Sequence, residues 1–118
     1  MSVTLHPDLA AAVMRDVVVS LVRRDGPALS AHQLGVFLTC YSVPGEHTVR
    51  GLAAKLDVSK SVVTRSLDKL SELGLAERRP DLRDRRSVLV GRTAAGAALL
   101  RDITGIAADT AKAWSPSA

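Results

Sequence analysis

Aromatic residues are almost absent from this sequence, which has one Phe, one Tyr and one Trp among 118 residues. The interior must therefore be built from Leu, Val, Ile and Ala. Hydrophobic residues make up 47% of the chain, so a core can form and wholesale disorder is excluded. Because Leu and Ala favour helices, we expect a mainly helical protein. The length supports a single domain spanning residues 1–118.

Cysteine is also rare. Cys40 is the only one, so no intrachain disulfide can form. The N-terminus lacks a basic region followed by a long apolar run, and no apolar stretch approaches the ~20 residues that span a bilayer. A cytoplasmic, reducing location is the default expectation. Cys40 lies near the end of an apolar segment with nothing basic beside it, which favours a buried, unreactive thiol over a redox sensor.

Catalytic and metal-binding patterns are also missing. The sequence has no Gly-rich phosphate loop, no Gly-x-Ser-x-Gly, no His-Glu-x-x-His and no carboxylate pair suited to a cleft. His6, His32 and His47 are far apart without metal-ligand spacing, which favours capping or surface roles. We therefore expect no enzyme, no cofactor and no metal site.

Positive charge, by contrast, is concentrated in one segment. The chain carries a net charge of +4, and residues 49–92 contain eleven basic and six acidic residues. The rest of the chain holds five basic and six acidic residues, so the whole excess lies in that segment. Such a distribution is the electrostatic footprint expected of a protein that binds phosphate groups of nucleic acid.

Apolar periodicity predicts four helices before any strand. Pro7 and Asp8 mark the start of a helix over residues 8–24 with an unusually wide apolar face. Ser30 and Gln33 form a capping box that begins the second helix. Thr48 and Ser59 can cap the third and fourth helices. The fourth helix has a core stripe of Val63, Leu67 and Leu70 and ends at Gly74.

The period then changes to that of strands. Residues 75–79 and 87–90 suit a β-hairpin whose tip, between them, is polar and rich in arginine. Thr93 caps a last helix over residues 94–114. The predicted fold is mainly α with a small β-hairpin, in the order of four helices, two strands and one helix.

Two short helices joined by a tight turn and followed by a charged hairpin define a winged helix-turn-helix, with residues 48–92 as the DNA-binding core. The major groove of DNA admits one α-helix, whose side chains meet base edges. The helix after Ser59 presents hydroxyls and cations, and Val62 could touch a thymine methyl group. Its predicted DNA contacts are Ser59, Lys60, Ser61, Val62, Thr64, Arg65 and Lys69.

The hairpin tip supplies a second set of predicted contacts. Arg83, Arg85 and Arg86 suit the minor groove, where A·T tracts deepen the negative potential. Asp84 is expected to brace the wing by pairing with a neighbouring arginine. Two plainer interpretations stay open: the tip could be only a solvated turn, and the two serines could only cap their helix.

These motifs resemble the MarR family of bacterial regulators. Residues 58–70 followed by Gly74-Leu75 look like its recognition helix, and residues 81–86 are similar to its Asp-x-Arg-Asp-x-Arg wing signature. Residues 92–96 resemble the Leu-Thr-x-x-Gly that opens the next helix, although Arg92 replaces the usual Leu. The resemblance implies a dimeric regulator, usually a repressor, that binds a palindrome, with Arg85 or Arg86 projecting and Asp84 bracing.

The family normally has two helices after the wing, and this chain has one, so we expect a shortened dimerisation region. Residues 8–24 and 94–114 are its candidate helices, and together they offer more apolar surface than a monomer needs. The resemblance also implies a small aromatic effector near that interface. The alternative function is a protein-interaction module that docks on another regulator or on RNA polymerase without sequence-specific DNA binding.

Overall fold

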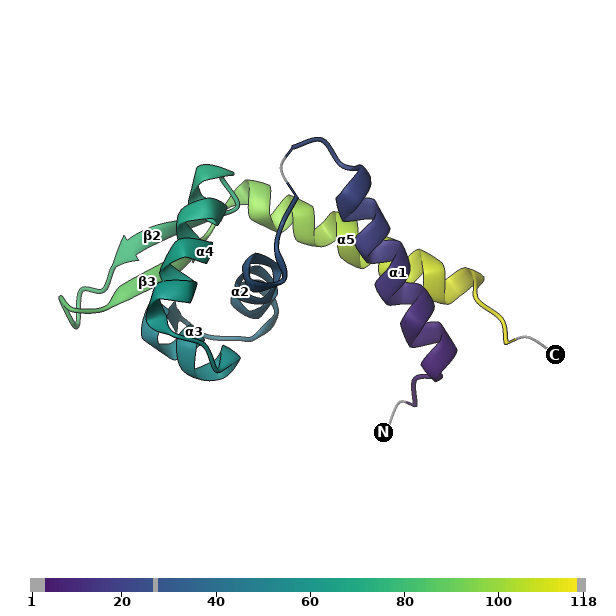
Figure 1. Cartoon of the computed structure of the whole chain (residues 1–118), viewed down its shortest axis with the longest axis horizontal. Coiled ribbons are helices and arrows are strands. Elements are labelled where there is room, and N and C mark those ends of the chain that lie inside the picture. The colour runs from purple at the N-terminus through teal and green to yellow at the C-terminus, as the bar shows by residue number, and fades with distance from the viewer. Residues whose placement is uncertain (1–3, 27, 117–118) are drawn as a thin grey trace. The chain divides into compact units, whose positions relative to one another are not determined.

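The computed structural model describes residues 4–26 and 28–116, which group into two compact units. One unit is residues 29–100, and the other joins residues up to 28 with those from 101 onward. One domain over residues 1–118 stays a prediction beside this division. The elements are α1 (Pro7–Arg23), α2 (Ala31–Ser42), β1 (His47–Thr48), α3 (Val49–Leu56), α4 (Lys60–Glu72), β2 (Ala76–Pro80), β3 (Val88–Arg92) and α5 (Ala94–Ala113) (Figure 1).

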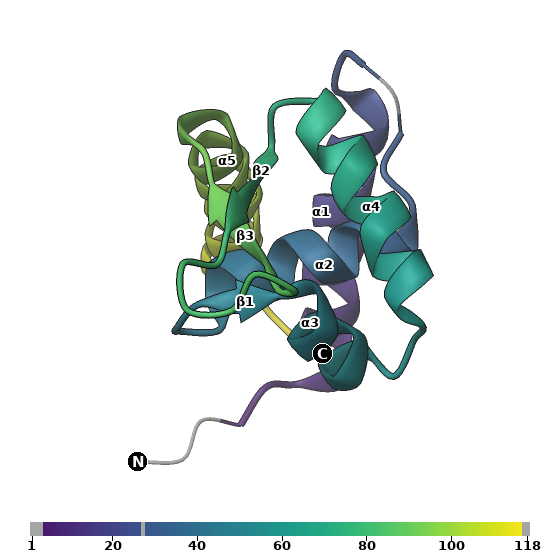
Figure 2. The same cartoon turned by 90° about the vertical axis from the view of Figure 1, so that its left-hand side faces the viewer.

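The predicted mainly helical winged helix-turn-helix is confirmed, with one strand more than expected. The sheet is antiparallel in the order β1-β3-β2, so the two-residue strand β1 extends the hairpin on the far side of β3 (Figure 2). His47 pairs with Val90 and Thr48 with Leu89. The expected hairpin is therefore one part of a three-stranded sheet.

The hairpin strands begin one residue later than predicted, at Ala76 and Val88. For β2 the reason lies at the end of α4, where Gly74 takes a positive φ of 74°. The Leu75 amide donates to the Leu70 carbonyl at 2.8 Å and the Gly74 amide to the Ser71 carbonyl at 3.0 Å, which is a Schellman motif. Leu75 is thus occupied in ending the helix, and pairing starts only after it.

Unit 29–100 is built around a mainly apolar core. The predicted stripe of α4 is confirmed, since Val63, Leu67 and Leu70 have no exposed surface. Phe37 of α2 and Leu52 of α3 are equally buried. Packing of α2 and α3 against one side of α4 leaves its opposite side for solvent.

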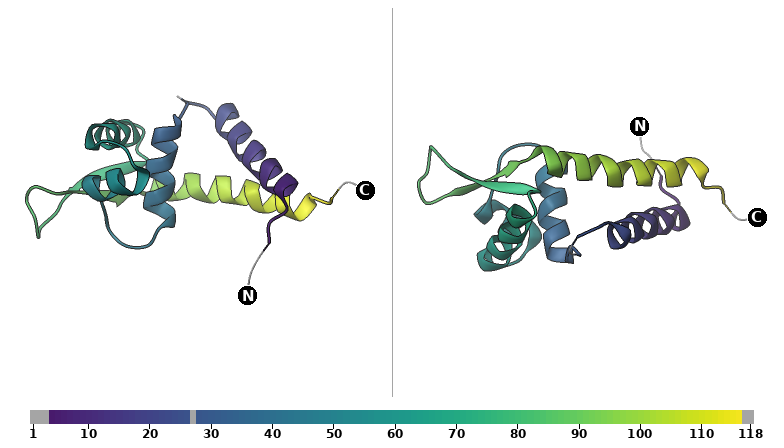
Figure 3. Two further views of the ribbon diagram at one scale, coloured as in Figure 1. Left: turned by 60° about the horizontal axis from the view of Figure 1, so that its bottom comes forward. Right: turned by 90° about the horizontal axis from the view of Figure 1, so that it is seen from above.

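The loop that joins β2 and β3, residues 81–87, is named the wing tip. Within unit 29–100 the hairpin carries the wing tip beyond α3 and α4 (Figure 3). Leu82 to Arg86 are all exposed. The arrangement is that of a finger standing beside the helix-turn-helix.

The other unit consists of α1 and the later turns of α5. His6 caps α1 through Nδ1, which accepts from the Asp8 amide at 3.1 Å, and its ring stacks obliquely on Trp114 at 5.1 Å. The Thr110 hydroxyl donates to Asp16 at 2.7 Å, and this bond lowers the pKa of that carboxyl below its ordinary value. Among the described residues, no helix has the length and apolar character needed to cross a membrane.

Candidate nucleic-acid interface

The solvent side of α4 begins with a serine that caps the helix. Ser59 Oγ accepts from the Val62 amide at 3.2 Å, and it lies 3.0 Å from Ser61 Oγ. The predicted contacts Ser59, Lys60, Ser61 and Arg65 are exposed, whereas Val62, Thr64 and Lys69 are half-buried. We name these seven residues the α4 ridge. Val62 lines an open hollow with His32 and Gln33 of α2, and its contact with a thymine methyl group stays a prediction.

The turn before α4 fixes how the ridge is presented. Asp57 ends α3 in the left-handed region with φ 54°, a conformation that Asp tolerates better than most residues. Its amide donates to the Ala54 carbonyl at 3.3 Å, and the Val58 amide to the Ala53 carbonyl at 3.0 Å. The two helices are therefore joined by a short, hydrogen-bonded turn.

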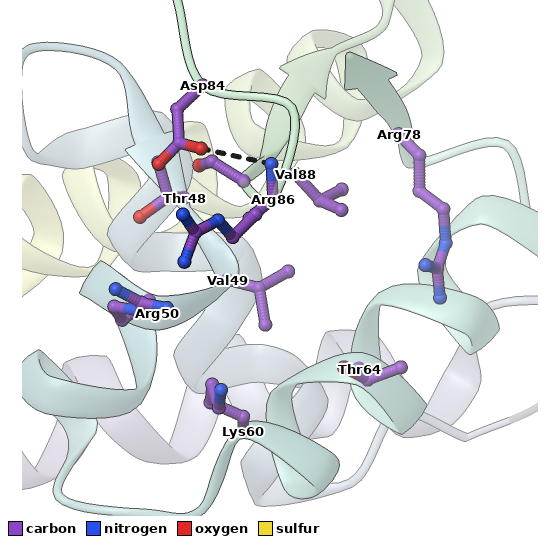
Figure 4. A pocket seen from close by; sticks show the side chains of 10 residues that line it. Thr48, Val49, Arg50, Lys60, Thr64, Arg78, Asp84, Arg86 and Val88 are labelled. Atoms are coloured by element: carbon purple, nitrogen blue, oxygen red, sulfur yellow. Dashed lines mark hydrogen bonds between the residues drawn. The ribbon is translucent and has the colours of Figure 1, made fainter. Parts of the chain in front are cut away.

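A cleft of about 310 Å³ opens between α3, α4 and the hairpin. Figure 4 shows Arg50 and Lys60 on its helical side, with Arg86 and Arg78 reaching toward it from the hairpin. We name this space the cationic cleft. Its full lining is Thr48, Val49, Arg50, Lys60, Thr64, Arg78, Asp84, Arg86, Ser87 and Val88.

The wing tip is stiffened by two aspartates in equivalent places. Asp81 Oδ1 accepts from the Arg83 amide at 2.9 Å, and Asp84 Oδ1 accepts from the Arg86 amide at 3.0 Å (Figure 4). These are consecutive Asx turns. Asp84 thus holds the backbone, and no ion pair joins it to an arginine within the described part of the chain, so the expected guanidinium partner is wrong.

Some cations near the ridge are already paired. Arg78 of β2 forms an ion pair with Asp68 of α4, which ties the hairpin to that helix. Lys69 lies 3.6 Å from Glu72 on the same helix. Arg83, Arg85 and Arg86 have no ion-pair partner among the described residues, which leaves their charge available to an anionic ligand.

Sequence reasoning missed Arg50, Arg78 and Thr48 as members of this surface. Arg50 lies in the first turn of α3 and Arg78 in β2, and only the fold brings them to one cleft. Their inclusion in the basic segment 49–92 was the one available signal for the two arginines.

Beside this surface, Tyr41 joins three elements of unit 29–100. Its hydroxyl donates to the Leu75 carbonyl at 2.7 Å and accepts from the Thr93 amide at 2.9 Å. Thr93 Oγ1 caps α5 by accepting from the Gly96 amide, and it donates to the Gly74 carbonyl at 2.7 Å. The end of α4, the start of β2 and the start of α5 are thereby fixed together.

Arg92 and His47 have structural roles of their own. Arg92 Nε donates to the Cys40 carbonyl at 2.9 Å, which satisfies a group at the end of α2. His47 is 4% exposed, so the expectation of a surface or capping role is wrong for it. Its Nε2 donates to the Val43 carbonyl at 2.7 Å, and Nδ1 then accepts from Lys55 at 3.4 Å.

Cys40 is buried, as the sequence predicted. Burial raises the pKa of its thiol to about 11, against a smaller opposing effect of the nearby cations Arg92 and Lys55. The described residues include no cluster of His, Cys, Asp and Glu suited to a metal ion.

Comparison with known proteins agrees with this geometry. A model of the MarR family matches residues 27–87, whereas no curated protein matches the sequence. A transcriptional regulator from Thermotoga maritima superposes with a TM-score of 0.75 at 22% identity, over 89% of this chain and 71% of its own. The structure of MarR itself gives 0.64 at 26% identity, over 87% and 75%. The protein YusO from Bacillus subtilis gives 0.68 at 20% identity, over 86% and 70%. Since the family model spans more than half of the sequence, this chain belongs to the MarR family of winged-helix transcription regulators.

Proposed function

We propose that this protein binds double-stranded DNA sequence-specifically as a homodimer and represses transcription from a palindromic operator. The α4 ridge enters the major groove, and the wing arginines enter the adjacent minor groove. The observation that carries the proposal is the cationic cleft between these two elements, because four basic side chains line it.

The cleft fits what lies between two adjacent grooves of DNA. A sugar-phosphate strand separates the major groove from its neighbouring minor groove, so a protein that fills both must accommodate that strand between its two reading elements. Arg50 and Lys60 on one side and Arg86 on the other supply the charge for this strand. The ridge and wing then contact bases on either side of it.

The dimer is supported by an uncovered apolar stripe on α1. Met14, Val18 and Val22 recur every four residues on this helix and are all exposed, although each is large and apolar. Burial of such a stripe against a second copy would stabilise a dimer. Two copies related by a two-fold axis present two α4 helices to successive major grooves ~34 Å apart, which is the reason for a palindrome.

A hollow of about 480 Å³ in the unit that contains α1 supports control by a small acidic effector. Its lining includes the apolar Ile106, an ion pair between Arg15 and Asp16, and two further cations, Arg23 and Arg24, which leave a net positive charge. An aromatic carboxylate matches that chemistry. Titration of the protein–DNA complex with such compounds should release DNA, and an unchanged complex contradicts this part of the proposal.

Selection of bound sequences from a random duplex pool is the first experiment. We expect a palindromic motif whose half-sites are about 10 base pairs apart. Affinity for that motif should fall steeply as salt rises, since counterions are released on binding. A protein that enriches no sequence and ignores duplex DNA at low salt, yet binds another regulator or polymerase, has the alternative function of an interaction module.

The wing is tested by Arg85→Ala combined with Arg86→Ala. We expect a loss of about 1–3 kcal/mol in binding free energy and a shallower salt dependence. The control is Arg101→Ala with Lys112→Ala, which removes the same charge from exposed sites on α5. Equal effects of the two double variants would mean that the wing arginines affect DNA affinity only through the net charge of the protein.

Arg65→Ala tests the ridge separately. Arg65 is exposed on α4, and we assign it a base contact, so its loss should relax the preference at one position of the selected motif. Selection repeated with this variant measures the change. Weaker binding with an unaltered motif would instead make Arg65 a phosphate contact.

A further inference from the structure

Leu82 has no explanation in the fold or in the contacts assigned so far. It lies in the wing tip with 94% of its surface exposed, more than any other large hydrophobic side chain that the structure describes. An apolar side chain held in water contributes nothing to folding. The wing tip stands at the far end of the hairpin, away from the helices that form the core of unit 29–100 (Figure 3).

The turn that holds Leu82 repeats the turn that holds Arg85. Leu82 follows Asp81 and Arg85 follows Asp84, and each is the central residue of an Asx turn closed by an aspartate. The Asp84 amide also donates to the Asp81 carbonyl at 3.3 Å, and the Ser87 amide to the Asp84 carbonyl at 3.0 Å. The backbone therefore presents the two side chains from equivalent positions of consecutive turns.

Leu82 and Arg85 also line one shallow hollow of the wing tip. Its volume is about 530 Å³, and Pro80, Asp81, Ser87 and Val88 complete the lining. An arginine and a leucine that share one surface fit a ligand with both a negative potential and an apolar edge. The minor groove of DNA offers both, in the acceptors on its floor of base edges and in the sugars that form its walls.

We propose that Leu82 enters the minor groove with Arg85 and acts as an apolar wedge against one base step. This inference rests on the proposed function. A wedge partly unstacks the step and bends the duplex, which makes binding depend on how easily that step deforms. Leu82 thus selects flexible pyrimidine–purine steps, TA or CA/TG, at a position where the wing makes no hydrogen bond with a base.

The experiment compares the wild-type protein with Leu82→Ala on a duplex that carries the selected operator. Energy transfer between dyes at the two ends reports the bend, and anisotropy reports affinity. We expect Leu82→Ala to weaken binding about tenfold and to reduce the bend. The salt dependence should stay unchanged because no charge is lost. Val43→Ala, which removes an exposed apolar side chain elsewhere in unit 29–100, is the control and should leave both readouts unchanged.

A second operator, in which the flexible step under the wing is replaced by a stiff AA/TT step, completes a double-mutant cycle. The replacement should weaken the wild type more than it weakens Leu82→Ala, because only the wild type deforms that step. Equal penalties, or an unchanged bend and affinity in Leu82→Ala, overturn the wedge. If Leu82 instead contacts a protein partner, Leu82→Ala should leave the bend and the affinity for DNA unchanged. A wild-type protein that binds no duplex fails the proposed function itself, so the two failures are distinct.

Discussion

The two units of this chain bury their apolar side chains to very different extents. In unit 29–100 the helices α2, α3 and α4 share a core whose members are fully enclosed, among them Phe37, Leu52, Val63, Leu67 and Leu70. In the other unit, α1 has no buried residue, and Met14, Val18 and Val22 are 53–74% exposed. Apolar burial stabilises unit 29–100 within one chain, whereas the exposed apolar side chains of α1 would be buried only in the proposed dimer.

Leu67→Ala should show the largest effect on this contrast. Leu67 has no exposed surface, so its truncation removes apolar contacts and leaves a cavity, at a cost of about 2–5 kcal/mol in the free energy of unfolding. Urea denaturation at fixed protein concentration measures it. The matched variant Val18→Ala removes apolar atoms from an exposed site and should stay within about 0.5 kcal/mol in dilute protein. Comparable losses would show that α1 is as well packed as α4.

Val18→Glu combined with Val22→Glu tests what α1 is for. Burial of two unpaired carboxylates is unfavourable, so self-association should weaken by at least about 2 kcal/mol while the monomer stays folded. Sedimentation measures the mass, and circular dichroism measures the helix content. The control carries the same substitutions at Val43 and Leu82, which are exposed in unit 29–100. An equal fall in solution mass for the variant and its control would contradict an interface on α1.

Tyr41→Phe removes a hydrogen bond that spans elements of unit 29–100. The Leu75 carbonyl and the Thr93 amide lose their partner, and the expected loss of stability is about 1–2 kcal/mol. Thermal unfolding checks this value. A loss near zero would mean that water replaces the hydroxyl at both groups.

Thr110→Val probes the corresponding bond of the other unit and should have the smallest effect. The Thr110 hydroxyl is the main cause that lowers the pKa of Asp16, so the wild-type bond stabilises the ionised carboxylate. Its contribution is present above the ordinary pKa of a carboxyl group and is lost as pH falls through the lowered pKa. Wild type and variant should therefore differ at neutral pH and converge in acid. A difference independent of pH would contradict the assignment.

The features that the sequence predicted well are local ones. The capping box of Ser30, the caps Thr48, Ser59 and Thr93, and the positive φ of Gly74 are all confirmed. Each depends on groups within five residues of one another along the chain, so the pattern can be read from the sequence itself. The core stripe of α4 is legible for the same reason, since its period belongs to one helix.

What the sequence could not show depends on partners far along the chain. Strand β1 has only two residues and exists because β3, more than forty positions later, pairs with it. His47, one of these two residues, is 4% exposed, and nothing in its local sequence signals that burial. The ion pair of Arg78 with Asp68 and the convergence of four cations on the cleft likewise need the fold, because spacing along the chain does not specify which surface side chains meet.

Gly96 shows how tightly the start of α5 is constrained. A glycine inside a helix costs up to about 1 kcal/mol relative to alanine, so a library that randomises α5 would be expected to replace it. A methyl group at this position, however, would collide with the Tyr41 hydroxyl and the Leu75 carbonyl. Directed evolution of this regulator toward greater heat resistance should therefore retain glycine at position 96. Replacement of Gly105 by a helix-favouring residue should be tolerated, because a methyl group there meets no atom within 4 Å.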